Sequence, residues 1–126
     1  MPGVAKVCIP ALLVFHLVED IVCGDCTGGE VNGCTANLPL GLYKKSFTSS
    51  CNRHDVCYMC GSKFGKSRSW CDWRFLQNML STCSTWDILC HGHAHCYFIA
   101  VLVFGAFFYH DSPVTWCDDS WIEPCI

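Results

Sequence analysis

The stretch "SCNRHDVCYMCG", residues 50–61, places three cysteines, a histidine and an aspartate in a short piece of chain. On an α-helix, steps of three and four residues return to the same face, so Cys51, His54 and Tyr58 share one side. Asp55 lies about 100° around the helix from His54. The histidine and the aspartate therefore have different surroundings, and we expect them to do different jobs.

The residues around this stretch predict a first helix over 47–59. Ser46, Thr48 and Ser49 are candidate N-caps, because a hydroxyl can accept a hydrogen bond from a free N–H of the first turn. Gly61 is the expected stop. The helix would therefore present His54 from its middle.

Two further helices are expected downstream. Residues 61–68 read as a polar connector, and residues 70–83 carry apolar side chains at helical spacing. Residues 84–95 read as irregular. The apolar run "CYFIAVLVFGAFFY", 96–109, suits a third helix that is buried against the other two or touches lipid.

Asp72 continues the apolar stripe of the predicted second helix. A carboxylate there needs a partner, since burying it unpaired costs several kcal/mol. His54 is the obvious candidate, and a histidine held by a buried carboxylate is typical of a general base. Two alternatives stay open. Ser69-x-x-Asp72 has the spacing of a capping box, and His54 can be a purely structural histidine.

Thirteen cysteines in 126 residues indicate a disulfide scaffold made in an oxidising compartment. The apolar run 7–18 has the length of a signal-peptide core, and the small Val22 and Gly24 suit a cleavage site. We therefore expect a signal peptide over 1–24, a single domain over 25–126, and a secreted, extracellular protein. The alternative is an N-terminal helix that the mature protein keeps.

Cleavage at Gly24 would leave 11 cysteines, whereas cleavage before Cys23 would leave 12. An odd count implies a free thiol or a disulfide-linked partner chain. For Cys57 and Cys60 we expect structural bridges rather than redox chemistry, because no thioredoxin-like pattern surrounds them.

The formal charge of −3 conceals an asymmetry, since every Lys and Arg lies at or before Arg74. The basic part can face lipid headgroups or simply stay solvated. No nucleic-acid partner is expected. A set of aromatic side chains suits either a lipid-binding surface or the core: Trp70, Trp73, Phe98, Phe107, Phe108 and Trp116.

The segment "HGHAH" offers His91, His93 and His95 between Cys90 and Cys96. If it is extended, alternate histidines point the same way and can bind Zn²⁺ or Cu²⁺. In an oxidising compartment we expect both cysteines in disulfides instead.

The stretch "CNRHDVCYMCG" resembles the active-site helix of secreted phospholipases A2, whose signature is Cys-x-x-His-Asp-x-Cys-Tyr. The Arg before His54, the single Cys51 and the later "CDWRFLQNM" are most similar to the bacterial, fungal and cone-snail (conodipine) branch. The resemblance covers roughly residues 32–105. It implies that His54 takes a proton from the water that attacks the sn-2 ester, and that Asp72 orients the imidazole.

The resemblance also implies a Ca²⁺ cofactor. Asp55 would bind the ion together with Asn32 and the backbone carbonyl of Gly33, in a loop that a Cys34–Cys51 disulfide ties to the helix. Asn32 stands where the branch usually has Asp, so the site has one carboxylate fewer. Ca²⁺ accepts amide oxygens, and we expect weaker binding.

The fold implied is mainly α: a small, disulfide-rich phospholipase A2-like domain with two antiparallel core helices, a third apolar helix and an N-terminal calcium loop. The function implied is calcium-dependent hydrolysis of glycerophospholipids at membrane surfaces, releasing fatty acid and lysophospholipid, in a venom or digestive setting. The alternative is a catalytically weak or inactive toxin or binding protein.

Overall fold

The computed structural model describes residues 26, 34 and 43–126 of the chain. The predicted signal peptide, 1–24, and the predicted calcium ligands Asn32 and Gly33 lie outside the described residues. The described part consists of three α-helices, α3, α4 and α5, with short 3₁₀ helices and no strand. The prediction of a mainly α, disulfide-rich domain is confirmed.

Helix α3 spans Thr48–Cys60, close to the predicted 47–59. Its N-cap is Phe47, and no side chain caps it, so the prediction of a hydroxyl cap at Ser46, Thr48 or Ser49 is wrong. Burial fixes this end instead, because the Phe47 side chain is completely buried. The hydrophobic effect thus replaces a capping hydrogen bond.

Helix α4, Arg68–Thr82, runs antiparallel to α3. Its N-cap is Ser67, whose side chain accepts a hydrogen bond from the backbone N–H of Trp70 at 3.1 Å. The capping box suggested for Ser69 and Asp72 is therefore wrong. Asp72 lies further into the helix and is buried.

Helix α5 spans Ile88–Phe104, so the prediction that 84–95 is irregular is wrong for most of that segment. The helix begins earlier than the predicted 96–109 because Asp87 caps it. The Asp87 carboxylate accepts from the backbone N–H of Cys90 at 3.0 Å. A short 3₁₀ helix, η4 (Gly105–Phe107), follows the end of α5.

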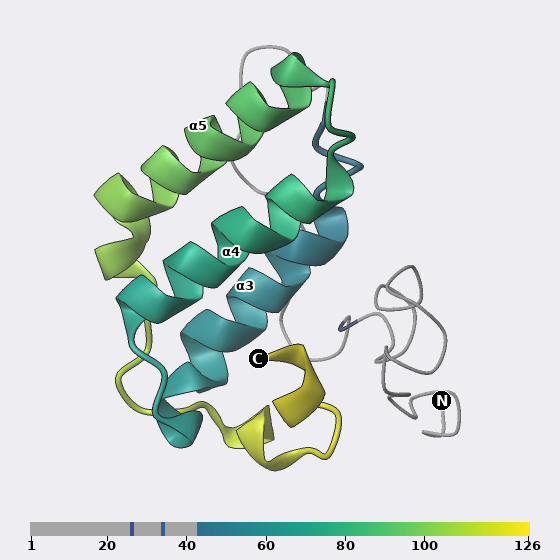
Figure 1. Cartoon of the computed structure of the whole chain (residues 1–126). Helices are drawn as coiled ribbons and strands as arrows, with labels where there is room; N and C mark the ends of the chain where they lie inside the picture. The colour runs from purple at the N-terminus through teal and green to yellow at the C-terminus, as the bar shows by residue number, and fades with distance from the viewer. Residues whose placement is uncertain (1–25, 27–33, 35–42) are drawn as a thin grey trace.

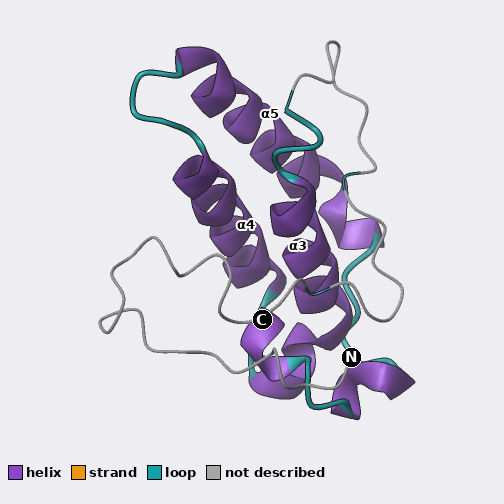
Figure 2. Cartoon of the chain, turned by 90° about the vertical axis from the view of Figure 1, so that its right-hand side faces the viewer, coloured by secondary structure: helices purple, strands orange, loops and turns teal. Residues whose placement is uncertain are grey.

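Helix α4 packs against both α3 and α5 (Figure 1). Its residues Phe75, Leu76 and Met79 are buried in the main core with Phe47 and Tyr97. The C-terminal 3₁₀ helices fold under α3, as the turned view shows (Figure 2). There they form a second core around Val56 and Ile122. Helix α3 is therefore covered on more than one side.

Five disulfides link ten of the described cysteines, and three of the bridges have a cysteine in α3. They are Cys26–Cys125, Cys34–Cys51, Cys57–Cys71, Cys60–Cys117 and Cys83–Cys90. Cys57 and Cys60 pair with distant cysteines rather than with each other, which confirms their structural role. The expectation that Cys96 is bridged is wrong, because it is an exposed free thiol.

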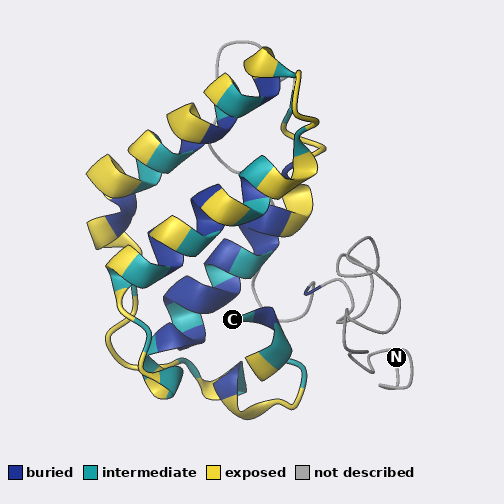
Figure 3. Ribbon diagram, in the orientation of Figure 1, coloured by how far each residue is buried: buried dark blue, intermediate teal, exposed yellow. Residues whose placement is uncertain are grey.

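The outer face of α5 is exposed and apolar (Figure 3). With η4 it forms a stretch, Ile88–Phe107, that is long and apolar enough to cross a membrane by length and composition alone. Core helices of soluble proteins and signal sequences can pass the same test. The exposed apolar residues of this face are Ile88, Leu89, Ile99, Leu102, Val103, Phe104 and Phe107.

The three histidines of "HGHAH" lie on α5, so the extended arrangement considered for Zn²⁺ or Cu²⁺ is wrong. His91 and His95 follow one another along one side of the helix, while His93 points elsewhere and packs against Tyr43. Within the described residues no group of three His, Cys, Asp or Glu side chains is placed to hold a metal.

Alanine substitutions at two glycines of the α5–η4 segment are expected to change the free energy of unfolding in opposite directions. A Cβ on Gly105 would overlap the Tyr58 hydroxyl and come within 3.2 Å of Arg68 Nη1, whereas a Cβ on Gly92 would meet nothing. Gly105→Ala should lower the free energy of unfolding by about 1–3 kcal/mol. Gly92→Ala should raise it by about 0.5–1 kcal/mol. Denaturant melts of both variants test this, and equal effects would contradict the packing described.

Candidate active site

The site is built on a contact between the two antiparallel helices. His54 Nε2 of α3 lies 2.8 Å from Asp72 Oδ1 of α4. His54 is 7% exposed and Asp72 only 1%. The disulfide Cys57–Cys71 joins the same helices beside this pair, one turn after His54 and one residue before Asp72. The side chains that helical spacing suggested as partners therefore do meet.

Asp72 has two further donors. The Tyr58 hydroxyl donates to Oδ1 at 2.6 Å, and Arg68 Nη1 lies 3.5 Å from Oδ2. Burial and the hydrogen bond to Asp72 raise the pKa of Tyr58 above its usual value, so the phenol keeps its proton. Helical spacing placed Tyr58 on the same face as His54 without a role, and the sequence analysis did not identify Arg68. Its only signal was the i, i+4 spacing to Asp72.

The contact with Asp72 selects one tautomer of a neutral His54. Opposite an ionised carboxylate, which only accepts hydrogen bonds, Nε2 carries the ring proton and Nδ1 keeps its lone pair. The ring stacks on Phe75, with centroids 4.4 Å apart and planes at 26°, and it also contacts Tyr58. The imidazole is thus held in one plane and one tautomer, as a general base requires.

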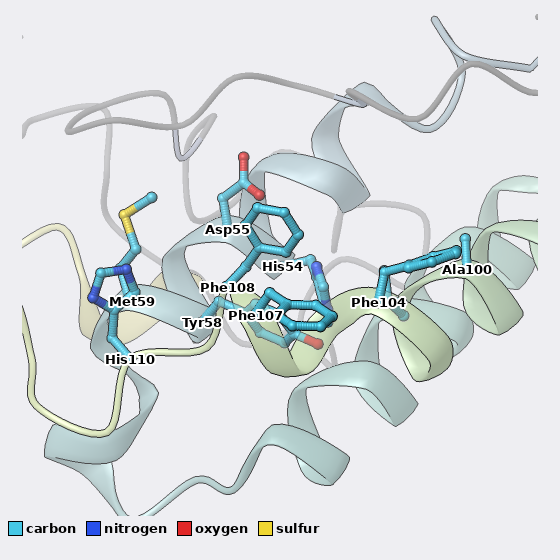
Figure 4. A pocket seen from close by; sticks show the side chains of 11 residues that line it. His54, Asp55, Tyr58, Met59, Ala100, Phe104, Phe107, Phe108 and His110 are labelled. Atoms are coloured by element: carbon cyan, nitrogen blue, oxygen red, sulfur yellow. The ribbon is translucent and has the colours of Figure 1, made fainter.

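A pocket of about 570 Å³ opens beside His54 (Figure 4). Helix α3 supplies one wall, and the end of α5 with η4 and the residues that follow supplies the other. The wall is mainly apolar, with polar groups from His54, Asp55 and His110. The lining residues are His54, Asp55, Tyr58, Met59, Ala100, Val101, Phe104, Gly105, Phe107, Phe108 and His110. Such a pocket suits a ligand with a long apolar part and one reactive polar group.

Asp55 lines the same pocket as His54, although it lies on a different side of α3. Its carboxylate is a hard oxygen donor of the kind Ca²⁺ prefers. One turn earlier, the Cys34–Cys51 disulfide is present and holds Cys34 against the helix. This is the pairing that the family resemblance implied. The other two predicted ligands, Asn32 and Gly33, lie outside the described residues.

The fold and the site together define a small, disulfide-stapled α domain of the phospholipase A2 type. The conodipine-M alpha chain of Conus magus is 36% identical to this chain over 53 residues, which is 42% of this chain and 69% of the relative. Conodipine-P3 and conodipine-P1 of Conus purpurascens are each 44% identical over 52 residues.

This chain belongs to the conodipine family of the secreted phospholipase A2 superfamily. Its match to conodipine-P3 covers 41% of this chain but only 29% of that relative. No family model matches the chain. No solved structure matches it either.

Replacing Tyr58 by Phe tests how strongly the buried carboxylate depends on its donors. Tyr58→Phe removes a hydrogen bond to a buried charged group and should lower the free energy of unfolding by about 1.5–3 kcal/mol. Tyr43→Phe is the matched control, because the Tyr43 hydroxyl donates to the partly exposed carboxylate of Asp87 at 2.9 Å. Its loss should be smaller, since water can replace the donor. A larger loss for Tyr43→Phe would contradict this account.

Proposed function

We propose that this protein is a secreted, calcium-dependent phospholipase A2 that hydrolyses the sn-2 ester of glycerophospholipids at membrane surfaces, as a venom or digestive component. The products are a fatty acid and a lysophospholipid. The observation that carries the proposal is the 2.8 Å contact between His54 and the buried Asp72 beside an apolar pocket. Membership of the conodipine family supports the same reaction.

The reaction follows from the tautomer of His54. A water molecule donates a hydrogen bond to Nδ1 and attacks the ester carbonyl carbon, and His54 takes its proton as the C–O bond forms. Asp72 stabilises the imidazolium that results. The intermediate then breaks its bond to the glycerol oxygen, which receives the proton back from His54. A positioned base of this kind contributes about 10²–10⁴-fold to the rate.

Calcium would be held by the Asp55 carboxylate, with the Asn32 side-chain oxygen and the Gly33 backbone carbonyl as further ligands. When bound, the ion stabilises negative charge on the ester oxygen. Asp55 suits this role because it lines the pocket that holds His54. The histidine and the aspartate then act on different atoms of one substrate.

The apolar wall of the pocket suits the acyl chain. Phe104, Phe107 and Val101 line it from the α5–η4 side, and Met59 lines it from α3. Apolar burial stabilises a bound chain by roughly 0.8 kcal/mol for each CH₂ group. It also keeps bulk water from the ester, so that the water held at Nδ1 is the one that reacts.

The exposed face of α5 suits a membrane surface. Apolar side chains cover it, and its sequence contains no Lys, Arg, Asp or Glu. Its C-terminal end reaches the pocket, since Phe104 and Phe107 belong both to the exposed face and to the lining. A lipid that leaves the membrane here would enter the pocket without crossing water.

A second candidate, a weakly active toxin or binding protein with a disulfide-linked partner chain, is favoured by Cys96. The five described bridges use ten of the 11 cysteines from Cys26 onward, and Cys96 is the one left over. An exposed thiol in an oxidising compartment is available for such a bridge.

The hydrolytic proposal is tested by fatty-acid release from sn-2-labelled phosphatidylcholine vesicles. Release should require Ca²⁺ and stop with a chelator, and His54→Gln should lower it by about 10²–10⁴-fold. His95→Gln is the matched control, because His95 is exposed on α5 and does not line the pocket. Absence of release from folded wild-type protein would refute the proposal and favour the second candidate.

If α5 contacts the membrane, an added positive charge should weaken vesicle binding when it lies on the exposed face of α5 and not when it lies elsewhere. Ile99→Lys should weaken sedimentation with phosphatidylcholine vesicles by about tenfold or more, since a lysine is costly in an apolar layer. Ser120→Lys adds the same charge to an exposed turn near the C-terminus and should change little. Hydrolysis of a monomeric short-chain phospholipid should be similar in both variants. Equal vesicle binding by both would show that α5 is not the docking face.

A further inference from the structure

Arg68 lies behind the candidate site and connects Asp72 of α4 to the α5 wall of the pocket. Its Nη1 is 3.5 Å from Asp72 Oδ2 and 3.3 Å from the backbone carbonyl oxygen of Val101. The arginine side chain is 31% exposed, whereas Asp72 is 1% exposed. Arg68 does not line the pocket, but Val101 does. Any effect of Arg68 on a substrate must therefore pass through other residues.

The charges around Asp72 distinguish Arg68 from the other residues that contact this carboxylate. His54 must be neutral when it acts as a base, and Tyr58 donates from a neutral phenol. Of the contacts to Asp72 described above, Arg68 alone carries a positive charge in that state. The other titratable groups of the pocket are Asp55, which adds negative charge, and His110. A buried carboxylate without a compensating cation is strongly destabilised, so the guanidinium favours the position in which Asp72 faces His54.

The contact with Val101 has a similar electrostatic basis. Val101 lies in the last turn of α5, where helix carbonyls carry partial negative charge and favour a cation. The same carbonyl accepts the backbone N–H of Gly105, which packs against the Tyr58 hydroxyl. The guanidinium thus sits between a carboxylate of α4 and the end of α5. The Val101 carbonyl therefore helps to keep the guanidinium beside Asp72.

We propose that Arg68 is a positioning residue for the proposed hydrolysis: its guanidinium holds the Asp72 carboxylate in place behind His54, and the Val101 carbonyl holds the guanidinium there. The inference rests on the proposed function. Without the guanidinium, Asp72 Oδ2 loses this contact, and the carboxylate is free to turn away from His54 Nε2. The imidazole is then no longer held with Nδ1 toward the reacting water, so it accepts the proton less often. Chemistry is lost while the pocket keeps its lining.

Steady-state kinetics with the labelled phospholipid test this assignment. Arg68→Gln should lower kcat by about 10–100-fold, the range expected from losing a hydrogen bond to a charged group, and leave KM within about twofold. Arg68→Lys should lie between Arg68→Gln and wild type. Arg74→Gln is the matched control, because Arg74 lies on the same helix, bonds Gln77 at 3.3 Å and stacks on Trp70. Its kcat and KM should both stay within about twofold.

Chemical rescue separates this role from a structural one. Millimolar guanidinium chloride should restore kcat to Arg68→Ala, and equal sodium chloride should not. Melting temperature and disulfide content are measured on each variant. If Arg68→Gln does not fold, the kcat of Arg68→Lys and the rescue of Arg68→Ala by guanidinium test the proposal instead. The proposal would be overturned by a kcat for Arg68→Gln within about twofold of wild type, or by a loss confined to KM. It would also be overturned if guanidinium failed to rescue Arg68→Ala and the Arg68→Lys and Arg68→Gln variants had the same kcat.

A readout without phospholipid distinguishes failure of this inference from failure of the proposed function. An α-bromoketone alkylates the imidazole nitrogen that carries the lone pair, and the modified His54 peptide is followed by mass. In calcium-free buffer at neutral pH, the alkylation rate should fall about tenfold or more in Arg68→Gln and be unchanged in Arg74→Gln. Unchanged alkylation in Arg68→Gln would overturn the inference even if wild type hydrolyses lipid. Slower alkylation would support it even if no hydrolysis is found.

Discussion

The carboxylate of Asp72 is the constraint on which the rest of the structure depends. A charge that is 1% exposed is tolerated only when donors surround it, and here they come from His54 and Tyr58 of α3 and from Arg68 of α4. Arg68 extends the arrangement to the end of α5. These contacts link all three helices, and the pocket beside them is lined by α3 and by the end of α5 with the residues that follow it.

Disulfides supply the rigidity that a small core cannot. A domain of about 100 residues buries a limited share of its apolar surface, and a bridge typically adds about 2–4 kcal/mol by restricting the unfolded chain. The placement of the bridges matters as much as their number. Cys57–Cys71 clamps the helices beside the His54–Asp72 pair, and Cys34–Cys51 brings Cys34 to the helix that carries Asp55.

The sequence predicted α3, α4 and the meeting of His54 with Asp72, because helical periodicity and the cost of a buried charge are local and general. It failed at the start of α5, where Gly92 and the histidines break the apolar pattern and a single Asp87 side chain begins the helix. Arg68 was missed because its partner Val101 contributes a backbone atom, which no residue pattern records. The assignments of Asn32 and Gly33 rest on family resemblance alone and stay predictions.

The bridge between Cys26 and Cys125 joins positions 99 residues apart and so encloses almost the whole domain in one covalent ring. If the chain is cut once between these cysteines, the two fragments remain joined through this disulfide. A protease that cleaves a single peptide bond between these cysteines would therefore convert the protein into two polypeptides that stay together and gain only the mass of one water molecule. One-chain and two-chain forms of this domain are therefore each a single covalent unit until a reductant is added.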